Sequence, residues 1–557
     1  MMTNAELAEL EAQNKQLKKN NAELKAANEE LSAQVKFLSE ELLLMRQRMF
    51  GVSSEKTSKV VFTNDRQLSL FNEAEFECDV NISVKDTDDE YQEITYKRKK
   101  KVGKREIDLS IFPVERVIHE LSDEKQICPN CRKPLAVCGH DVLRRELVRI
   151  PAQYKVKEHV QTVYACNDVD CQDAEDKTTM VKAYVTPPLI PGSGIASASL
   201  VAHIAHQKYT LALPLYRQEQ EFKRDSIPLS RQTMANWIIY VAFTYLILIY
   251  EIMKQDLVGR TVVHADETSV QVLHESGKPA TSKSYMWIYR TSCDTDRHIV
   301  LFEYRPNRKH ENPQIFLEGF NGFLHSDGYQ AYNNLTDNVT VVGCWAHMRR
   351  KFTDILKSLP DYNRPNSPAK VGRDYCDKLF ELEREFAELP SRDNFNARYE
   401  ARLVKTKPIM EEFFSWADSL TGSFRALPKS PLGKAIAYTL NQRQNLENVL
   451  LDGRLEISNN RAERAVKPFA VGRKNWLFSN TENGAKASAV FYSLIETAKE
   501  SSLSPYKYLE FIFEAAPSLD LFNKPYLAEA LLPWNTPPDC RSTNQAKAPV
   551  SLAWDET

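Results

Sequence analysis

The chain has 557 residues, which is too long for a single hydrophobic core and predicts several domains. Its contents of 42% hydrophobic and 27% charged residues are ordinary for soluble globular proteins. The net charge of −2 does not by itself indicate a nucleic-acid partner, so any such partner must be inferred from local patterns.

Residues 5–50 contain no Gly or Pro and keep a heptad repeat. One column of the repeat is Leu10, Leu17, Leu24, Leu31, Leu38 and Met45, and the other is Leu7, Asn14, Asn21, Asn28, Val35, Leu42 and Met49. Leucine in one column and repeated asparagine in the other predict a parallel leucine-zipper coiled coil, and therefore a homodimer or higher oligomer. The alternative is one amphipathic helix packed on its own domain.

Residues 51–110 carry an acidic block followed directly by a basic one, with little periodicity. This composition predicts a mostly disordered linker. The basic run, which begins at Lys97, is interpreted either as an arm that contacts phosphates or as a solvated tether. The first residues lack the charged-then-apolar pattern of a secretion signal, so a cytoplasmic protein is expected.

Residues 111–190 predict a small zinc-binding β domain. Ten cysteines in so long a chain do not make a disulfide scaffold. Four of them form two pairs, Cys128 with Cys131 and Cys166 with Cys171, and two such pairs suit a tetrahedral Zn²⁺ site. Apolar alternation between the pairs, from Leu147 to Val163, predicts the strands of a zinc ribbon. The second pair has a wider spacing, so Cys138, His140 and His159 are substitute ligands, and four reduced cysteines are the alternative.

A Pro- and Gly-rich boundary at 187–194 precedes a helical region at 195–255. Its segment 228–237 is similar to the entry into the second helix of a helix-turn-helix. Ser230 would cap that helix, and Arg231, Gln232 and Asn236 would lie on its exposed, DNA-binding face. Plain helical packing is the alternative. The apolar stretch from Trp237 to Tyr250 is too short for a membrane span and predicts a buried helix.

Residues 256–480 predict an α/β domain. Strands are expected near 261–266, 284–290, 298–304, 322–326 and 339–344, with a helix around 312–319. Helices follow from Trp345 to about Gly453 and again at 484–532. Beyond Pro533 a loose tail is expected.

Three carboxylates distant in the sequence are candidates for one site. Asp266 follows a run of β-branched residues and is expected where a short buried strand ends, beside Glu267. Asp327 lies just beyond a later strand, and Glu463 lies on an expected helix that Pro468 would end. Carboxylates on two strands and a helix can hold two divalent cations, which is what in-line displacement at phosphorus requires.

The helix that carries Glu463 has further polar residues at three- and four-residue steps. Asn460, Arg464 and Lys467 would share a face with Glu463, which suits a helix beside a phosphodiester. Residues 472–476 would then follow the helix, and Arg473, Lys474 and Trp476 would supply backbone contacts and base stacking.

Several motifs together resemble those of the bacterial insertion-sequence-66 family transposases. They are His264–Thr268, Ser326–Tyr329, Gly343–Phe352, Asn459–Arg464 with Gly472–Phe478, and Leu213–Glu219. The resemblance runs from the zipper to about residue 516. It implies a multidomain α+β protein: an N-terminal coiled coil, a zinc-ribbon-like domain, a ribonuclease-H-like catalytic core with an all-helical insertion at about 350–450, and a C-terminal helical segment.

The resemblance also implies the roles of individual residues. Asp266, Asp327 and Glu463 would be the metal-binding triad of an Asp-Asp-Glu transposase with Mg²⁺ or Mn²⁺ as cofactor. Cys344 and His347 match a Cys-x2-His signature and would support the site or position DNA in preference to the alternative, a role in binding zinc, with Arg349 and Arg350 as DNA contacts. The partners would be element ends and target DNA, with companion proteins encoded by the same element and no membrane.

Two other functions remain open from the sequence alone. One is an inactive or domesticated relative that binds DNA as a regulator. The other is a ribonuclease-H-like nuclease that hydrolyses DNA without joining it.

Overall fold

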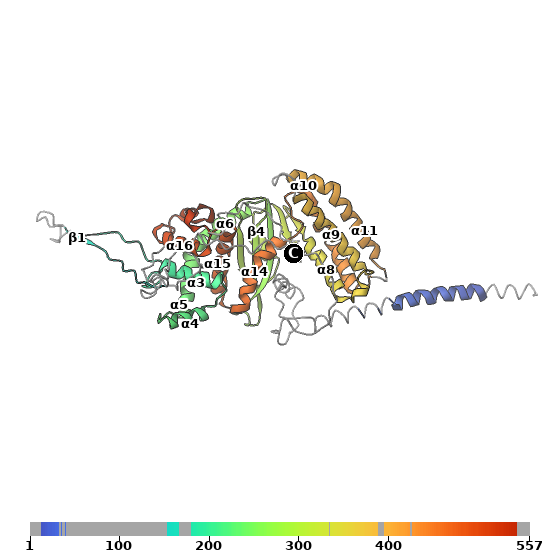
Figure 1. Cartoon of the computed structure of the whole chain (residues 1–557), viewed down its shortest axis with the longest axis horizontal. Coiled ribbons are helices and arrows are strands. Elements are labelled where there is room, and N and C mark those ends of the chain that lie inside the picture. Colours follow the sequence, from blue (N-terminus) through green and yellow to red (C-terminus); the bar gives the residue numbers. More distant parts are fainter. Residues whose placement is uncertain are drawn as a thin grey trace, which may run out of the picture. The chain divides into compact units, whose positions relative to one another are not determined.

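The computed structural model describes residues 13–32, 35, 39, 153–165, 180–332, 335–387, 395–423 and 426–542 (Figure 1). Contacts divide the chain into two units, one of Ala74–Val185 and one of Met1–Glu73 with Thr186–Thr557. The boundary after Val185 adjoins the prolines at 187 and 188, where the sequence predicted one. The linker 51–110 lies outside the described residues.

Residues 13–32 form one uninterrupted helix. Leu17, Leu24 and Leu31 of the heptad column are 60%, 68% and 59% exposed. The whole described helix is exposed, so these leucines are not packed against the rest of the described chain and remain available to a partner helix; the pairing itself stays a prediction.

The described part of the smaller unit is a short antiparallel pair of strands. β1 (Val163–Ala165) pairs with β2 (Met180–Lys182). Residues 153–162 lie outside any strand and are exposed, so the strands expected across Tyr154, Val156 and Val160 are wrong. His159 is exposed, whereas the four cysteines predicted to bind zinc, Cys138 and His140 lie outside the described residues.

The helical region begins with α3 (Ala198–Tyr209), α4 (Leu215–Arg224) and α5 (Arg231–Val241). The backbone N–H of Thr233 donates to Ser230 Oγ at 3.1 Å, which confirms Ser230 as the N-cap of α5. A π-helical turn (Ala242–Leu246) continues α5 into α6 (Ile247–Val258). By length and composition this continuous helix could cross a membrane. Its apolar face, however, is buried in the main hydrophobic core, and this burial accounts for its apolar composition without a membrane.

The central sheet contains the five strands that the sequence predicted. They are β3 (Val262–His274), β4 (Lys283–Thr291), β5 (Val300–Arg305), β6 (Gly322–Ser326) and β7 (Val339–Gly343). The order is β5-β4-β3-β6-β7: β3, β4 and β5 form an antiparallel meander, and β6 and β7 run parallel to β3. Helix α7 (Glu311–Phe316) lies between β5 and β6 in the sequence, close to its expected range. A short strand, β8 (Ser479–Thr481), pairs with the far end of β3.

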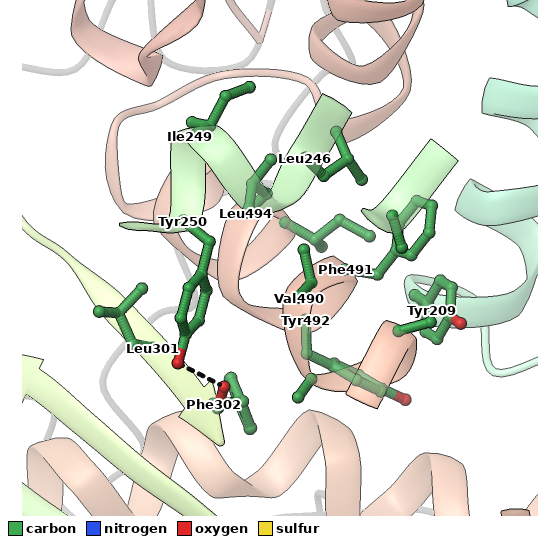
Figure 2. Close-up of a cluster of buried hydrophobic side chains, with 14 of the residues drawn as sticks. Tyr209, Leu246, Ile249, Tyr250, Leu301, Phe302, Val490, Phe491, Tyr492 and Leu494 are labelled. Carbon is green, nitrogen blue, oxygen red and sulfur yellow. Dashed lines mark hydrogen bonds between the residues drawn. The ribbon is translucent and has the colours of Figure 1, made fainter. Parts of the chain in front are cut away.

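Helix α15 (Glu482–Glu500) protects the edge of this sheet. The backbone N–H groups of Phe302 and Val300 on the edge strand β5 donate to Ser493 Oγ at 2.7 Å and Thr497 Oγ1 at 3.0 Å. These hydroxyls satisfy donors that would otherwise be open to another strand. Figure 2 shows the core beside this edge, where the Tyr250 hydroxyl donates to the Phe302 carbonyl at 3.1 Å.

Helix α16 (Pro505–Ala515) is followed by a packed C-terminal segment. Short 3₁₀ turns cover Pro525–Leu531, Pro533–Asn535 and Pro538–Cys540. Cys540 is buried, and its carbonyl accepts from the Ser504 N–H at 2.8 Å. The loose tail predicted from Pro533 is therefore wrong for residues 533–542, because backbone and core contacts hold them. Residues 543–557 lie outside the described part.

Helices follow β7 as predicted from the sequence and build a second hydrophobic core. They are α8 (Trp345–Ser358), α9 (Pro368–Ala387), α10 (Phe395–Ala401), α11 (Lys407–Leu420), α12 (Pro431–Asn441) and α13 (Arg443–Glu447), with a π-helical turn at Arg402–Thr406 and short 3₁₀ turns at Asp361–Asn363 and Asn448–Leu451. Trp345, Phe352, Phe413 and Phe414 are fully buried in it. Figure 1 shows α8–α11 on the opposite side of the sheet from α15 and α16.

Helix α14 (Asn460–Trp476) lies against β3 and β4 and does not end at Pro468. The prediction of a stop there is wrong, and residues 472–476 lie within the helix. A proline leaves the carbonyl four residues earlier without its helical donor. That carbonyl belongs to Arg464, which is exposed, so water can replace the missing donor.

Candidate active site

Asp266 lies in the interior of β3, paired with Ile288 of β4. The expectation that a strand ends here is wrong, since β3 continues to His274. Successive side chains of a strand point to opposite faces, so Asp266 and Glu267 are directed to different sides of the sheet. Asp266 is only 7% exposed, and its Oδ1 accepts from the Glu267 N–H at 2.8 Å.

Asp327 follows β6 directly, in the loop that begins at the carboxyl end of this parallel strand. The N–H of Tyr329 donates to Asp327 Oδ1 at 3.0 Å, and the Tyr438 hydroxyl donates to the Asp327 carbonyl at 2.9 Å. Gly328 between them has φ of +84°, and a Cβ there would lie 2.8 Å from the Tyr438 hydroxyl. Glycine is therefore required for this turn.

Glu463 lies one turn into α14 and is 7% exposed. Burial raises the pKa of Asp266 well above its usual value, and the negative charges of Glu267, Asp327 and Glu463 raise it further. Asp327 and Glu463 are thus each near enough to Asp266 for their charges to act on it. Their accumulated charge favours a bound cation.

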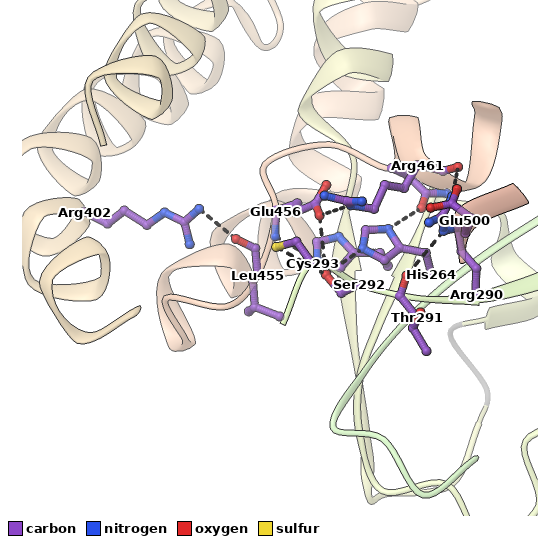
Figure 3. Close-up of polar contacts among 12 residues, drawn as sticks. His264, Arg290, Thr291, Ser292, Cys293, Arg402, Leu455, Glu456, Arg461 and Glu500 are labelled. Carbon is purple, nitrogen blue, oxygen red and sulfur yellow. Dashed lines mark hydrogen bonds and ion pairs between the residues drawn. The ribbon is translucent and has the colours of Figure 1, made fainter. Parts of the chain in front are cut away.

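A buried polar network connects the three elements that carry these carboxylates. Figure 3 shows its part around His264, Glu456 and Arg461. Asn459, the N-cap residue of α14, donates from Nδ2 to the Ala265 carbonyl at 2.8 Å. Its Oδ1 lies 2.9 Å from Nδ1 of His264, so that nitrogen carries the proton and donates. Burial lowers the pKa of His264 to about 4, which keeps the ring neutral at pH 7.

His264 also contacts the strand that leads to Asp327. His264 and His325 are register partners on β3 and β6, and their rings stack with centroids 4.3 Å apart. Nε2 of His325 accepts from the Glu456 N–H at 3.2 Å. Each histidine precedes its aspartate by two residues. On β3 this spacing puts the His264 ring and the Asp266 carboxylate on one face of the sheet, whereas Asp327 already lies in the loop after β6. The paired pattern His-x-Asp was visible in the sequence and could have revealed this support, which sequence reasoning missed.

Glu456 anchors the loop before α14. Burial raises the pKa of Glu456, but Arg461 and His264 more than offset this effect and lower it to about 2. Arg461 forms an ion pair with Glu456, and Arg290 bonds the Arg461 carbonyl at 3.3 Å and Glu500 at 3.2 Å. These contacts fix the start of the helix that carries Glu463.

Glu267 belongs to a separate cluster. Arg308 donates to its Oε1 from Nε at 2.8 Å, and the Tyr332 hydroxyl donates to its Oε2 at 2.7 Å. The Arg308 guanidinium also lies over the Tyr329 ring, 3.7 Å from the centroid. The cluster therefore links the strand of Asp266 to the loop of Asp327.

Cys344 and His347 lie beside Glu463. Cys344 is the buried N-cap residue of α8, and its Sγ accepts from the Asn459 N–H at 3.1 Å. Burial lowers the pKa of His347, but the neighbouring Cys344 and Glu463 outweigh it and raise the pKa to about 9. Arg350, predicted to contact DNA, lies 3.4 Å from Glu463 Oε2.

The remaining predicted site residues differ in exposure. Asn460, Arg464, Lys474 and, on α5, Arg231, Gln232 and Asn236 are exposed; Lys467, Arg473, Trp476 and Arg349 are half-buried. Arg349 pairs with Asp377, and Trp476 packs edge-on against Phe469. Ligand atoms of Cys344, His347 and Glu463 lie within 4.8 Å of one another, and Asp327 and Glu463 are near enough to Asp266 for their charges to raise its pKa. Arg231, Gln232 and Asn236 lie on a separate helix.

The crowded carboxylates predict that Asp266→Asn stabilises the metal-free protein. Because the pKa of Asp266 is raised on folding, the unfolded chain loses this proton first, and stability falls as pH rises above about 4. In EDTA at pH 8 we expect Asp266→Asn to raise the free energy of unfolding by about 1–2 kcal/mol, or a few degrees in Tm. The gain should shrink toward pH 4. The exposed Asp337→Asn is the control, and an unchanged or lower Tm for Asp266→Asn would contradict the prediction.

Comparisons with known proteins identify the class and then the family. The family model "Transposase IS66 family" matches residues 193–487, and the model "zinc-finger binding domain of transposase IS66" matches residues 125–168. The first match covers more than half of the chain. The chain is thus of the transposase class, and it belongs to the IS66 transposase family. The zinc-finger match includes Cys128, Cys131 and Cys166 but ends before Cys171.

Similar proteins occur in Sinorhizobium fredii (strain NBRC 101917 / NGR234). The uncharacterized protein y4qI is 32% identical over 64% of this chain, and the match spans 65% of y4qI, just under two thirds of its length. The uncharacterized protein y4jD is 30% identical over 74% of this chain and 79% of its own length. No solved structure matches the chain.

Proposed function

We propose that this protein is a DNA transposase that cleaves a strand at each end of its element and joins the freed 3′-hydroxyl to target DNA. The observation that carries this proposal is that Asp327 and Glu463 are near enough to Asp266 to raise its pKa, on elements joined by the parallel pairing of β3 and β6. An antiparallel meander followed by two parallel strands, with α14 against the sheet, supports a ribonuclease-H-like core.

The three carboxylates suit a magnesium pair. Their oxygens are the donors that Mg²⁺ prefers. The pKa of Asp266 is raised by burial and, beyond that, by the nearby carboxylates, so a bound cation would offset both effects. We assign Asp266, Asp327 and Glu463 as the residues that would hold Mg²⁺ or Mn²⁺. Such ions would supply activation of the attacking oxygen and stabilisation of the leaving oxygen, and no covalent enzyme intermediate would be needed.

Residues around the carboxylates would bind and orient the DNA. Asn460 and Arg464 are exposed on the first turns of α14, next to the buried Glu463, and can contact phosphate oxygens. Arg473 donates from Nη1 to Thr268 Oγ1 at 3.3 Å, which ties the later part of α14 to β3 beyond Asp266. Lys474 is exposed on the same helix and can contact the DNA backbone.

The other parts of the chain would bring the DNA to this site. We assign residues 5–50 to a dimerising coiled coil, the zinc-finger domain to a Zn²⁺-stabilised DNA-binding module held by Cys128, Cys131, Cys166 and Cys171, and α4 with α5 to a helix-turn-helix. Companion proteins and a cytoplasmic location belong to the same proposal.

The proposal is tested with the full-length protein and DNA that carries an element end. Magnesium-dependent nicking followed by joined product supports a transposase. Nicks without joining would support a nuclease, and binding without cleavage would support a DNA-binding regulator.

Asn459→Ala should weaken metal binding and cleavage, although Asn459 itself is not expected to contact DNA. The change leaves the Ala265 carbonyl and His264 Nδ1 without their buried partners, at a cost of about 1–3 kcal/mol in stability. We expect about 100-fold slower cleavage, because small displacements of reacting groups have effects of that size. The Mn²⁺ concentration for half-maximal cleavage should rise while DNA affinity stays unchanged. The exposed Asn321→Ala is the control, and an unchanged Mn²⁺ requirement would show that Asn459 does not align the carboxylates.

Leu24→Asp should prevent assembly through the N-terminal helix. A charge in the leucine column of a coiled coil faces the partner helix and cannot be solvated there. We expect sedimentation to give a smaller species than for wild type. Ala26→Asp, two residues away on the outward side of the heptad, is the matched control. Equal masses for wild type and Leu24→Asp would contradict the coiled coil.

A further inference from the structure

Cys344, His347 and Glu463 bring three different ligand atoms together. β7 ends at Gly343, so Cys344 caps α8 and His347 follows on the first turn of that helix. Residues three apart share a helix face, and Glu463 of α14 meets that face. The sulfur, a ring nitrogen and a carboxylate oxygen all lie within 4.8 Å of one another.

Two of these atoms lack a partner in good hydrogen-bond geometry. Nδ1 of His347 and Oε1 of Glu463 are 3.3 Å apart, and both are buried without a hydrogen bond. Arg350 approaches the opposite atoms of the same side chains, Nε2 and Oε2, at 3.4 Å each. Buried polar atoms usually have partners, so this pair points to a ligand between them.

The donor set indicates the class of ligand. Magnesium takes oxygen ligands, whereas thiolate and imidazole favour Zn²⁺ and similar ions. In a tetrahedral zinc site, ligand atoms are roughly 3.4–3.6 Å apart, which follows from bond lengths near 2.0–2.3 Å. The group must therefore contract by about 1 Å, which side-chain rotations can supply. The Asn459 N–H on Cys344 Sγ is a contact typical of the shell around a metal ligand.

We propose that Cys344, His347 and Glu463 bind one zinc-class ion, distinct from that of the zinc-finger domain, and that this ion competes with the magnesium pair for Glu463. The competition for Glu463 rests on the proposed function, whereas the binding of the zinc-class ion does not. Coordination through Nδ1 leaves a proton on Nε2, so Arg350 must move away from that atom. Its remaining contact with Glu463 Oε2 can hold the carboxylate while Oε1 binds the ion.

The first experiment measures metal content and thiolate ligation in the full chain. We expect Cys344→Ser and His347→Asn each to contain one zinc fewer than wild type. Cobalt titration should show a weaker thiolate-to-cobalt charge-transfer band in Cys344→Ser than in wild type. Cys293→Ser removes a half-buried thiol outside the group and is the matched control. Circular dichroism shows whether each variant folds. If one of them does not, the zinc content of the other variant tests the proposal.

The second experiment adds zinc to magnesium-dependent cleavage reactions. Zinc should inhibit wild type, and the concentration for half-inhibition, relative to each variant's own rate, should rise at least tenfold in Cys344→Ser. Equal zinc contents and identical cobalt spectra in wild type and both variants would overturn the site, leaving only an ion pair between His347 and Glu463. If both variants contain one zinc fewer than wild type but wild type never cleaves DNA, the metal site stands and the proposed function is overturned.

Discussion

Asp266→Asn or Glu463→Gln should each reduce magnesium-dependent strand cleavage and joining by at least about 10³-fold, while DNA binding survives. Removing one carboxylate charge removes a ligand from the metal pair, and a loss of about 4 kcal/mol in transition-state stabilisation corresponds to that factor. DNA affinity should persist because phosphate contacts come from basic side chains elsewhere. The measurements are cleavage rates on end-containing DNA and binding at fixed salt concentration.

Glu267→Gln is the matched control for this prediction. It removes an adjacent buried carboxylate, but one that Arg308 and Tyr332 hold and that points to the other face of the sheet. We expect its cleavage rate to stay within about tenfold of wild type. Wild-type activity in Asp266→Asn or Glu463→Gln would remove that residue from the triad.

Arg402→Met should be among the most destabilising single changes in the described part of the chain. Arg402 is fully buried, and its guanidinium donates to both carboxylate oxygens of Glu383 at 2.7 and 2.8 Å. It also donates to the carbonyls of Val449, Asp452 and Leu455. The variant removes the main partner of the half-buried Glu383, which keeps only the longer ion pair to Arg398 at 3.9 Å, and it takes away a buried donor from three carbonyls. Together these losses cost about 3–5 kcal/mol. We expect Tm to fall by roughly 10 °C.

Two controls distinguish the loss of the buried Arg402 contacts from the general effect of removing a positive charge. Arg402→Met combined with Glu383→Leu should be less destabilised than Arg402→Met alone, because the half-buried carboxylate that lost its main partner is also removed. Lys405→Met breaks an exposed ion pair with Glu385 and should change stability by less than about 1 kcal/mol. A Tm for Arg402→Met near that of wild type would contradict this account of the helical insertion.

The Arg402 contacts also help to position the loop that leads to Glu463. Leu455 precedes Glu456, which bonds to His325 and pairs with Arg461 at the start of α14. The inserted helices thus hold the loop that leads to Glu463, as Figure 3 shows for Arg402 and Leu455. Loss of Arg402 should therefore slow cleavage even at temperatures where the protein remains folded.

The strands of the sheet were predictable because β-branched runs and alternation report burial directly. The length of β3 was not predictable, because the polar residues Asp266, Glu267 and Thr268 suggested that the strand ends there. In the structure all three are buried and paired with β4. The helix after Asn459 was also predictable, but its passage through Pro468 depends on the exposure of Arg464, which only the fold determines.

The support around the carboxylates could be predicted only in part. The repeated His-x-Asp pattern is local, but the stacking of His264 on His325 requires the parallel register of β3 and β6. Likewise, the link from Asn459 to Ala265 joins residues far apart in the sequence, so spacing alone cannot reveal it.

The central claim is that Asp266, Asp327 and Glu463 hold one pair of divalent cations. The most direct test is anomalous scattering from Mn²⁺ in crystals of the full chain bound to element-end DNA. The account predicts two manganese ions roughly 3.5–4 Å apart, with oxygens of all three carboxylates as ligands. Manganese that binds without contacting Asp266 or Glu463, or carboxylates that remain out of reach of a shared pair on DNA, would contradict it.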